Sequence, residues 1–435
     1  MSTLRRAIHV PPASPRARLR FGSRGRTARL DVLLFTAAST VLALHAAVDS
    51  FIAPEPGTGP GDHLLRGLVT LVLLALAVAL YPRLAAGARA AVAAVLGVLA
   101  LEGAGLAIAD ARAVGARGED WTGFLLAPVG LLLCGLAVVL LWRSRKSGRL
   151  RYLRRGAIAL AAILAAYWLV VPVAMAILAT HRPRADVRPA DLGRPYEDVT
   201  VRTGDGLDLA AWYVPSRNGA AVISYPTRKG KPAQARMLAW HGYGVLLLDA
   251  RGYDGSEGDP NMFGWEGAKD IEAAVAWLRE RADVIDNRIG GIGFSVGGEV
   301  MLEAAASNEE LRAVVSEGAG VRSVREDLMR GPSGWFTLPQ AAVQTAALAV
   351  LSGTAPPPSL EDLVPRIAPR DLFLIYAENS GGGEELNPDY YRAASEPKSL
   401  WKVQDAGHVG GFQTQPEEYE ERVIRFFDGA LLGAG

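Results

Sequence analysis

Residues 289–299, Ile-Gly-Gly-Ile-Gly-Phe-Ser-Val-Gly-Gly-Glu, constrain the fold of this chain more than any other stretch. A short apolar run ends in Gly-x-Ser-x-Gly and continues into a helix-like segment, which predicts a strand, a tight turn and a helix. Gly293 and Gly297 leave room beside Ser295, because a Cβ at either position would press on the neighbouring strand or helix. Ser295 is therefore a candidate nucleophile, although a plain glycine-rich turn before a helix has the same pattern.

The apolar residues are unevenly distributed along the 435 residues. Hydrophobic residues make up 50% of the chain, and the surplus lies in the first 180 residues, which are dense in Leu, Ala and Val. The remainder has the mixed charge of a globular domain. We expect a basic cytoplasmic tail at 1–30, a transmembrane domain at 31–180, a linker at 181–195 and a globular domain at 196–435.

Five apolar runs approach the ~20 helical residues that cross a hydrocarbon core. They are residues 32–51, 65–84, 90–108, 124–142 and 156–179. Glu102 interrupts the third run, and an ionisable residue inside a span suggests a proton or lipid-headgroup site. The alternative is that Glu102 snorkels, is protonated or bonds a neighbouring helix.

Clusters of Lys and Arg predict the orientation of these runs, because positively charged flanks stay on the cytoplasmic side during insertion. The basic segments are the tail and the loops at 83–89 and 143–155. Five crossings from a cytoplasmic N-terminus place the globular domain outside the cytoplasm. The sequence therefore predicts a multi-pass protein of the inner or plasma membrane. A cleaved signal peptide ending near residues 43–46 is the alternative for the first run, but four more runs follow it.

Beyond residue 195, β-like and helix-like segments alternate, as in an α/β domain. The expected strands are 197–202, 207–214, 220–225, 245–249, 286–292, 311–315, 371–377 and 399–403, and the expected helices are 268–282, 295–306 and 416–432. The Gly-x-Ser-x-Gly turn lies between the strand expected at 286–292 and the helix expected at 295–306. With this order of strands and helices, residues 195–432 resemble the α/β-hydrolase superfamily and are similar to its dienelactone-hydrolase and prolyl-peptidase-like branch. Residues 249–256, Asp-Ala-Arg-Gly-Tyr-Asp-Gly-Ser, also resemble a loop of that family.

The resemblance implies a mostly parallel sheet flanked by helices, and a triad in the order Ser, acid, His. Of six histidines only His408 follows Ser295, so His408 is the expected general base. The acid is expected in the loop at 378–385, which contains three glutamates. Glu384 is the first choice, because it follows a glycine run and precedes a helix, while Glu378 and Glu385 stay open.

The resemblance also implies an oxyanion hole and a cap over the pocket. The backbone N–H groups of Val296 and Thr227 are the expected oxyanion donors, with Tyr225-Pro226 standing where the family has His-Gly. The cap is expected at about residues 318–358, where Trp335 and Phe336 suggest an acyl pocket for an apolar or amphipathic substrate. The alternative is a surface helix pair with no gating role.

These features predict a membrane-anchored serine hydrolase with an acyl-enzyme intermediate, first of all an esterase acting outside the cytoplasmic membrane. Thioesterase, peptidase and acyltransferase activities are variants, and a non-catalytic membrane protein with a ligand- or partner-binding hydrolase-like domain is the alternative. We expect membrane lipids and a small or lipid-like acyl substrate as partners. No nucleotide or His-Glu-x-x-His motif occurs, Cys134 is the lone cysteine and the net charge is +1, so no cofactor, metal or nucleic-acid partner is expected.

The orientation can be tested with terminal tags in intact spheroplasts. An N-terminal tag should be shielded from added protease, whereas a C-terminal tag should be digested, because the arginine-rich segments stay in the cytoplasm. The opposite pattern would overturn the argument from the arginine clusters.

Overall fold

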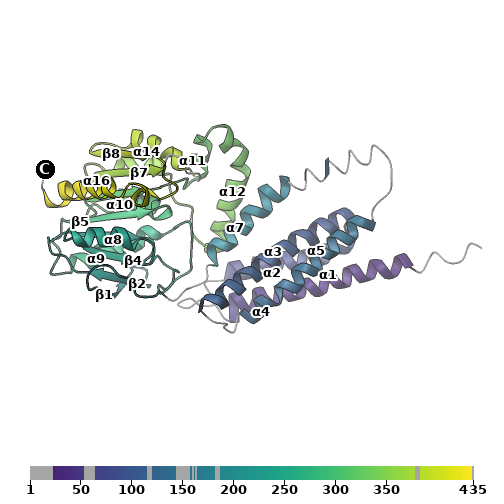
Figure 1. Ribbon diagram of the computed structural model, residues 1–435. Helices are drawn as coiled ribbons and strands as arrows, with labels where there is room; N and C mark the ends of the chain where they lie inside the picture. The colour runs from purple at the N-terminus through teal and green to yellow at the C-terminus, as the bar shows by residue number, and fades with distance from the viewer. Residues whose placement is uncertain are drawn as a thin grey trace, which may run out of the picture.

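The computed structural model describes residues 23–52, 64–114, 120–143, 157–158, 161, 164–181, 187–377 and 383–433. Figure 1 shows two parts, a group of long apolar helices and a sheet domain covered by helices on both faces. Helices α7 (Val171–Thr180) and α12 (Pro332–Ser352) lie side by side on the flank of the sheet domain that faces the apolar helices.

The sheet has eight strands in the order β1-β2-β4-β3-β5-β6-β7-β8. The strands are β1 (Glu197–Arg202), β2 (Asp208–Val214), β3 (Ala221–Tyr225), β4 (Gly244–Leu248), β5 (Ile289–Phe294), β6 (Ala313–Glu317), β7 (Asp371–Ala377) and β8 (Lys398–Val403). Strands β1 and β2 pair antiparallel at one edge, whereas the pairs from β4 to β8 are parallel. This mixed sheet with flanking helices confirms the expected α/β-hydrolase fold.

Alternate residues of the strands face opposite sides of the sheet, as the two-residue period requires. On one side Ile223 and Leu246 pack under helices α9, α10, α13 and α14, and on the other Val222 and Val245 pack under α8 and α16. These helices and two short neighbours are α8 (Pro232–Trp240), α9 (Gly267–Arg279), α10 (Val296–Ser307), α11 (Val324–Met329), α13 (Leu360–Leu363), α14 (Asn387–Ala393), α15 (Gly411–Thr414) and α16 (Pro416–Phe427).

Several details of the sheet domain differ from the sequence-based expectation, among them the shift of β6 to residues 313–317 from the expected 311–315. Strand β5 begins at Ile289 rather than at residue 286, because residues 285–288 form a turn in which the N–H of Arg288 donates to the carbonyl oxygen of Ile285. The N–H of Ile285 donates to the carbonyl oxygen of Gly219, which holds this turn beside the start of β3. Helix α8 was not expected, and Pro232 lies in its first turn, where a missing N–H costs nothing.

The apolar helices of the first half only partly match the five expected crossings. They are α1 (Ser23–Ala47), α2 (Leu64–Leu80), α3 (Ala86–Val114), α4 (Asp120–Phe124), α5 (Leu126–Arg143) and α7, with the π-helical segments η1 (Val48–Ile52) and η3 (Ala166–Val170) and the 3₁₀ segment η2 (Tyr81–Arg83). Among the described residues three helical segments are long and apolar enough to cross a membrane, Leu30–Ile52, Ala86–Gly105 and Trp121–Leu141. The second and fifth expected crossings correspond to the shorter apolar helices Gly67–Arg83 and Ala166–Thr180.

Small residues let α3 and α5 approach each other closely. A Cβ placed on Gly130 would lie 2.8 Å from the carbonyl oxygen of Gly97, and one on Gly97 would lie 3.0 Å from the carbonyl oxygen of Gly130. Close backbone contact through small residues is how helices associate where water supplies no hydrophobic driving force. Glu102 lies on α3 near this crossing and is partly buried.

The expected cap region contains α11 and α12, but its aromatic pair does not line a pocket in the sheet domain. Trp335 is 72% exposed and Phe336 is 52% exposed. The ring of Phe336 packs against Tyr167 and Trp168 in η3, at centroid distances of 5.5 and 5.6 Å. The expectation of an acyl pocket built from Trp335 and Phe336 is therefore wrong, because Trp335 is mostly exposed and Phe336 packs against η3.

Candidate active site

Ser295 occupies a sharp turn between β5 and α10. Its backbone has φ 54° and ψ −125°, a region that side chains other than glycine rarely adopt. A Cβ on Gly293 would overlap the backbone of Gly297, and a Cβ on Gly297 would lie 2.5 Å from the carbonyl oxygen of Tyr225. The glycines therefore let α10 pack against β3 and β5 while Ser295 projects from the turn.

Ser295, His408 and Glu384 come together at the carboxyl ends of the parallel strands. The Nε2 of His408 lies 2.8 Å from Oγ of Ser295, and its Nδ1 pairs with Oε1 of Glu384. Glu384 is 1% exposed, and its other oxygen accepts a hydrogen bond of 2.8 Å from the N–H of Ala377 at the end of β7. The carboxylate is thus held from both sides, and only one of its oxygens faces the imidazole.

The other two glutamates of this loop are in different positions. Glu385 turns away from His408, and its Oε1 accepts a 2.7 Å hydrogen bond from Nε of Arg330. Glu378, the remaining alternative for the acid, lies outside the described residues. Glu384 is therefore the loop glutamate that the structure brings to His408.

The two expected oxyanion donors lie on neighbouring elements. Val296 is the first residue of α10, where a backbone N–H has no acceptor within the helix. Thr227 follows β3 directly after Tyr225 and Pro226, whose atoms lie over Gly297. Its Oγ1 is buried and has no hydrogen-bond partner among the described residues. A polar atom left unpaired in this loop is consistent with a site that takes a ligand oxygen.

Two residues that the sequence did not single out, Glu317 and Lys231, hold the loop of His408. Glu317, at the end of β6, accepts hydrogen bonds from the N–H of Gly411 at 3.0 Å and from the hydroxyl of Tyr419 at 2.7 Å. Lys231 donates from Nζ to the carbonyl oxygen of Val409 at 2.8 Å. Val409 has φ 47°, an unfavourable value for a β-branched residue, so the loop depends on these contacts for its shape.

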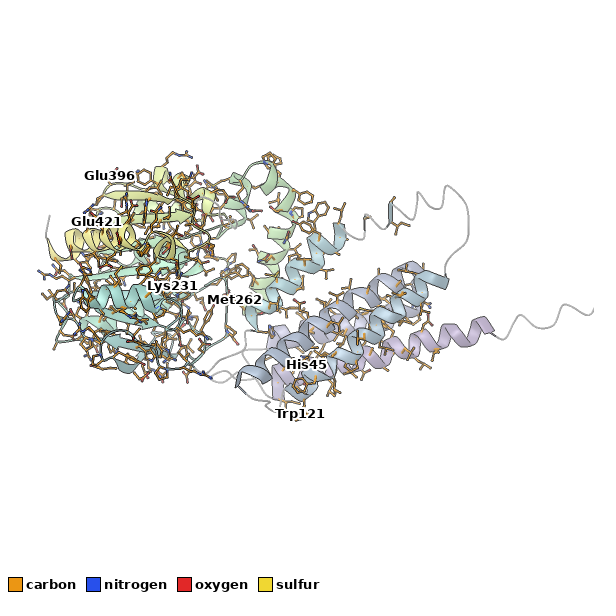
Figure 2. The ribbon with its side chains drawn as sticks, viewed as in Figure 1. His45, Trp121, Lys231, Met262, Glu396 and Glu421 are labelled. Atoms are coloured by element: carbon orange, nitrogen blue, oxygen red, sulfur yellow. The ribbon has the colours of Figure 1, made fainter. Side chains whose placement is uncertain are left out.

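Lys231 and Glu317 also place charge near the imidazole. Burial lowers the pKa of Lys231, opposed by Glu317, and burial raises the pKa of Glu317, opposed by the Tyr419 and Gly411 hydrogen bonds. Figure 2 marks Lys231 within the sheet domain. No sequence motif flags either residue, because their roles come from loops that meet only in the folded chain.

The hydrogen bond that His408 donates to Glu384 raises the pKa of His408 above its ordinary value, against partial burial and the charge of Lys231, which lower it. A histidine that is paired with a carboxylate accepts a proton more readily. Since its Nε2 faces the hydroxyl of Ser295, His408 can take the hydroxyl proton when a substrate carbon is attacked.

A cavity of about 230 Å³ lies between α12 and the sheet domain. It is lined by polar side chains of α12, among them Thr337, Gln340 and Gln344, and by Glu299, Arg322, Asp327 and Arg330 of the sheet domain. In the described part of the chain, no group of three or more His, Cys, Asp or Glu side chains is placed to hold a metal ion.

The sequence matches the family described as X-Pro dipeptidyl-peptidase (S15 family) over residues 183–404, which is about half of the chain. The chain belongs to the S15 family. This membership makes the sheet domain a member of the α/β-hydrolase superfamily and agrees with the strand order and with the turn at Ser295.

Each of three similar proteins covers a little more than half of this S15 family member. An uncharacterized protein of Mycobacterium tuberculosis, Rv2307c, is 30% identical over 243 residues, which are 52% of this chain and 75% of that protein. The uncharacterized protein YfhR of Escherichia coli is 24% identical over 255 residues, 54% of this chain and 81% of that protein. The solved esterase Pf2001 of Pyrococcus furiosus is 25% identical, with a TM-score of 0.47 over 57% of this chain and 97% of that one.

Glu384→Gln should reduce kcat by about 10⁴-fold while KM and the free energy of unfolding change little. The amide would present N–H groups to Nδ1 of His408, which favours the wrong tautomer and leaves the imidazolium without its counter-ion. Steady-state kinetics on a chromogenic ester would measure the loss. Glu385→Gln is the matched control and should be mild, because its ion pair with Arg330 is half exposed. A large loss of kcat in Glu385→Gln together with a small loss in Glu384→Gln would refute the assignment of Glu384 as the triad acid.

The pH profile of kcat/KM should fall on the acidic side with a midpoint above 6.5, the ordinary histidine value. The base must be neutral, and a raised pKa keeps His408 protonated to higher pH, so activity is lost as the pH falls through that pKa. In the residual activity of Glu384→Gln the midpoint should move down, since the raising hydrogen bond is removed. Glu385→Gln should leave it in place, and an unshifted midpoint in Glu384→Gln would contradict the coupling.

Proposed function

We propose that this protein is a membrane-anchored serine hydrolase that works through a Ser295-His408-Glu384 triad. The observation that carries the proposal is the continuous chain of contacts from Oγ of Ser295 through both nitrogens of His408 to a buried carboxylate. Three side chains from three separate loops, arranged nucleophile to base to acid, have the geometry of an activated serine. A purely structural turn does not require such an arrangement.

The proposed reaction has two stages. Oγ of Ser295 attacks the acyl carbon while Nε2 of His408 takes its proton, and the negative oxygen is held by the backbone N–H groups of Val296 and Thr227. His408 then gives that proton to the leaving group, and an acyl-enzyme remains. Water attacks this ester with His408 again as base, which releases the acid and restores the serine hydroxyl.

Membrane anchoring is the second part of the proposal. The three helical segments that are long and apolar enough to cross, together with the shorter helices Gly67–Arg83 and Ala166–Thr180, support five crossings. With the basic tail in the cytoplasm, the hydrolase domain lies outside the inner or plasma membrane. The shorter helices span less than the ~30 Å core by themselves, so the residues that flank them are part of the proposed crossings.

The substrate that we propose is an ester with an apolar or amphipathic acyl part. The support for this choice is the composition of α12, which carries many apolar side chains and no charged one. A peptidase is the second candidate, because the matching family is described as X-Pro dipeptidyl-peptidase. Both reactions use Ser295. They differ in whether an ester or a peptide bond is cleaved, and in which part of the substrate binds next to that bond.

A fluorophosphonate probe should label the full-length protein in detergent and should not label Ser295→Ala, because only an activated serine reacts rapidly with such probes. On the same preparations, p-nitrophenyl esters should be hydrolysed faster than Xaa-Pro p-nitroanilides. The reverse preference would favour the peptidase. Absence of labelling in a folded wild-type protein would instead favour a non-catalytic role that binds a ligand or partner.

A further inference from the structure

The cavity of about 230 Å³ between α12 and the sheet domain begins close to the triad. Glu299 in its wall lies about one helical turn after Ser295, and the N–H of Glu299 donates a 3.2 Å hydrogen bond to the carbonyl oxygen of Ser295. A Cβ on Gly264 would lie 2.8 Å from Val296, an expected oxyanion donor, and 3.9 Å from Arg322, which lines the cavity. The cavity is therefore adjacent to the atoms at which an ester would react.

We propose that this cavity binds the alcohol part of the ester substrate, and that it selects an uncharged alcohol with several hydroxyl groups, such as glycerol or a sugar. The inference rests on the esterase activity proposed above and names the substrate class more closely. Because the acyl part of that substrate is apolar or amphipathic in the proposal, a polar cavity beside Ser295 suits the alcohol part better than the acyl part.

The charged side chains in the wall of the cavity are paired with one another. Arg322, whose side chain is 1% exposed, pairs with Glu303 and lies 3.6 Å from Glu299. Arg330 pairs with Asp327 at 3.2 Å. A bound anion would lie against the carboxylates of the wall and a bound cation against its guanidinium groups, and like charges placed together are costly. The wall therefore favours an uncharged ligand.

The wall also carries polar groups that have no hydrogen-bond partner within the described part of the chain. On α12 these groups are the side chains of Gln340, Gln344 and Thr345, which all line the cavity. On the sheet domain, Nε of Arg322 is buried and has no partner among the described residues. Each amide can donate and accept, whereas Nε of Arg322 can only donate. Since buried polar groups are normally paired, these groups are positioned for a hydrogen-bonding ligand.

A polyol matches this set of groups better than a simple alcohol does. Every hydroxyl both donates and accepts, so several hydroxyls can pair with the two amides and with Nε of Arg322 at the same time. Trp265 and Leu348, which are 5% and 3% exposed, supply an apolar part of the wall against which the carbon atoms of a polyol can pack. An ethyl group would leave the polar groups unpaired, and a site built to bind hydroxyls discriminates against such an analogue.

The test compares three esters of butyric acid on the full-length protein in detergent, with acid release measured by titration. Monobutyrin carries glycerol, ethyl butyrate carries a simple alcohol, and butyrylcholine carries a cationic one. The double variant Gln340→Leu/Gln344→Leu removes both amides and nearly keeps the size of the side chains. Ala346→Leu, on the exposed side of the same helix, is the control. Fluorophosphonate labelling of each variant measures the triad separately.

The wild-type kcat/KM should be about tenfold higher for monobutyrin than for ethyl butyrate or butyrylcholine, since the loss of two hydrogen bonds to neutral groups has about that effect. In the double variant the ratio of kcat/KM between monobutyrin and ethyl butyrate should fall to about one, because the amides that distinguish the two alcohols are gone. Ala346→Leu should keep the wild-type ratio. If the double variant loses fluorophosphonate labelling, each single variant should still lower the ratio.

Equal kcat/KM for monobutyrin and ethyl butyrate, or an unchanged ratio in the glutamine variants, would overturn the inference and leave the serine hydrolase intact. A preference for butyrylcholine would also overturn it, since the cavity would then bind a cation. Fluorophosphonate labelling without hydrolysis of any of the three esters would overturn it in favour of the peptidase. Absence of both labelling and hydrolysis in the folded wild type would overturn the proposed function and the inference together.

Discussion

The close backbone contact between α10 and the central strands is the constraint on which the site depends. Gly297 lies so near Tyr225 that no side chain fits between them, and Gly293 lies equally near the first turn of α10. Because the helix cannot move away without opening the sheet core, the chain must turn sharply at Ser295, with φ 54°. The cost of that conformation, of order 1–3 kcal/mol, is offset by the packing of β3, β5 and α10 around it.

The candidate base and acid depend on a second constraint, the burial of carboxylates at the ends of β6 and β7. Glu317 and Glu384 are nearly inaccessible to water, and buried carboxylates require hydrogen-bond donors. Glu384 finds them in the N–H of Ala377 and in His408, while Glu317 finds them in Gly411 and Tyr419. The loop of His408 is therefore held on both sides by groups that would be costly to leave unpaired.

The cap region joins the hydrolase domain to the apolar helices through two kinds of surface. The polar face of α12 meets polar side chains of the sheet domain, and its apolar residue Leu348 packs against α7. Such a division explains why an aromatic pair in the cap can lie away from the pocket. The hydrophobic effect has no directional preference, so the ring of Phe336 can pack against Tyr167 and Trp168 instead of lining an acyl pocket.

The sequence by itself determined the elements whose signals are local. The strand-turn-helix around Ser295, the two edge strands and the parallel strands follow from short-range periodicity and glycine spacing, and His408 follows from chain order. Only the tertiary structure decided between neighbours of the same chemistry. Glu384 and Glu385 are adjacent glutamates, yet one turns to Ala377 and His408 while the other pairs with Arg330, because long-range partners orient each side chain. The same holds for Lys231 and Glu317, whose contacts with the loop of His408 join residues far apart in the chain and leave no periodic signal in the sequence.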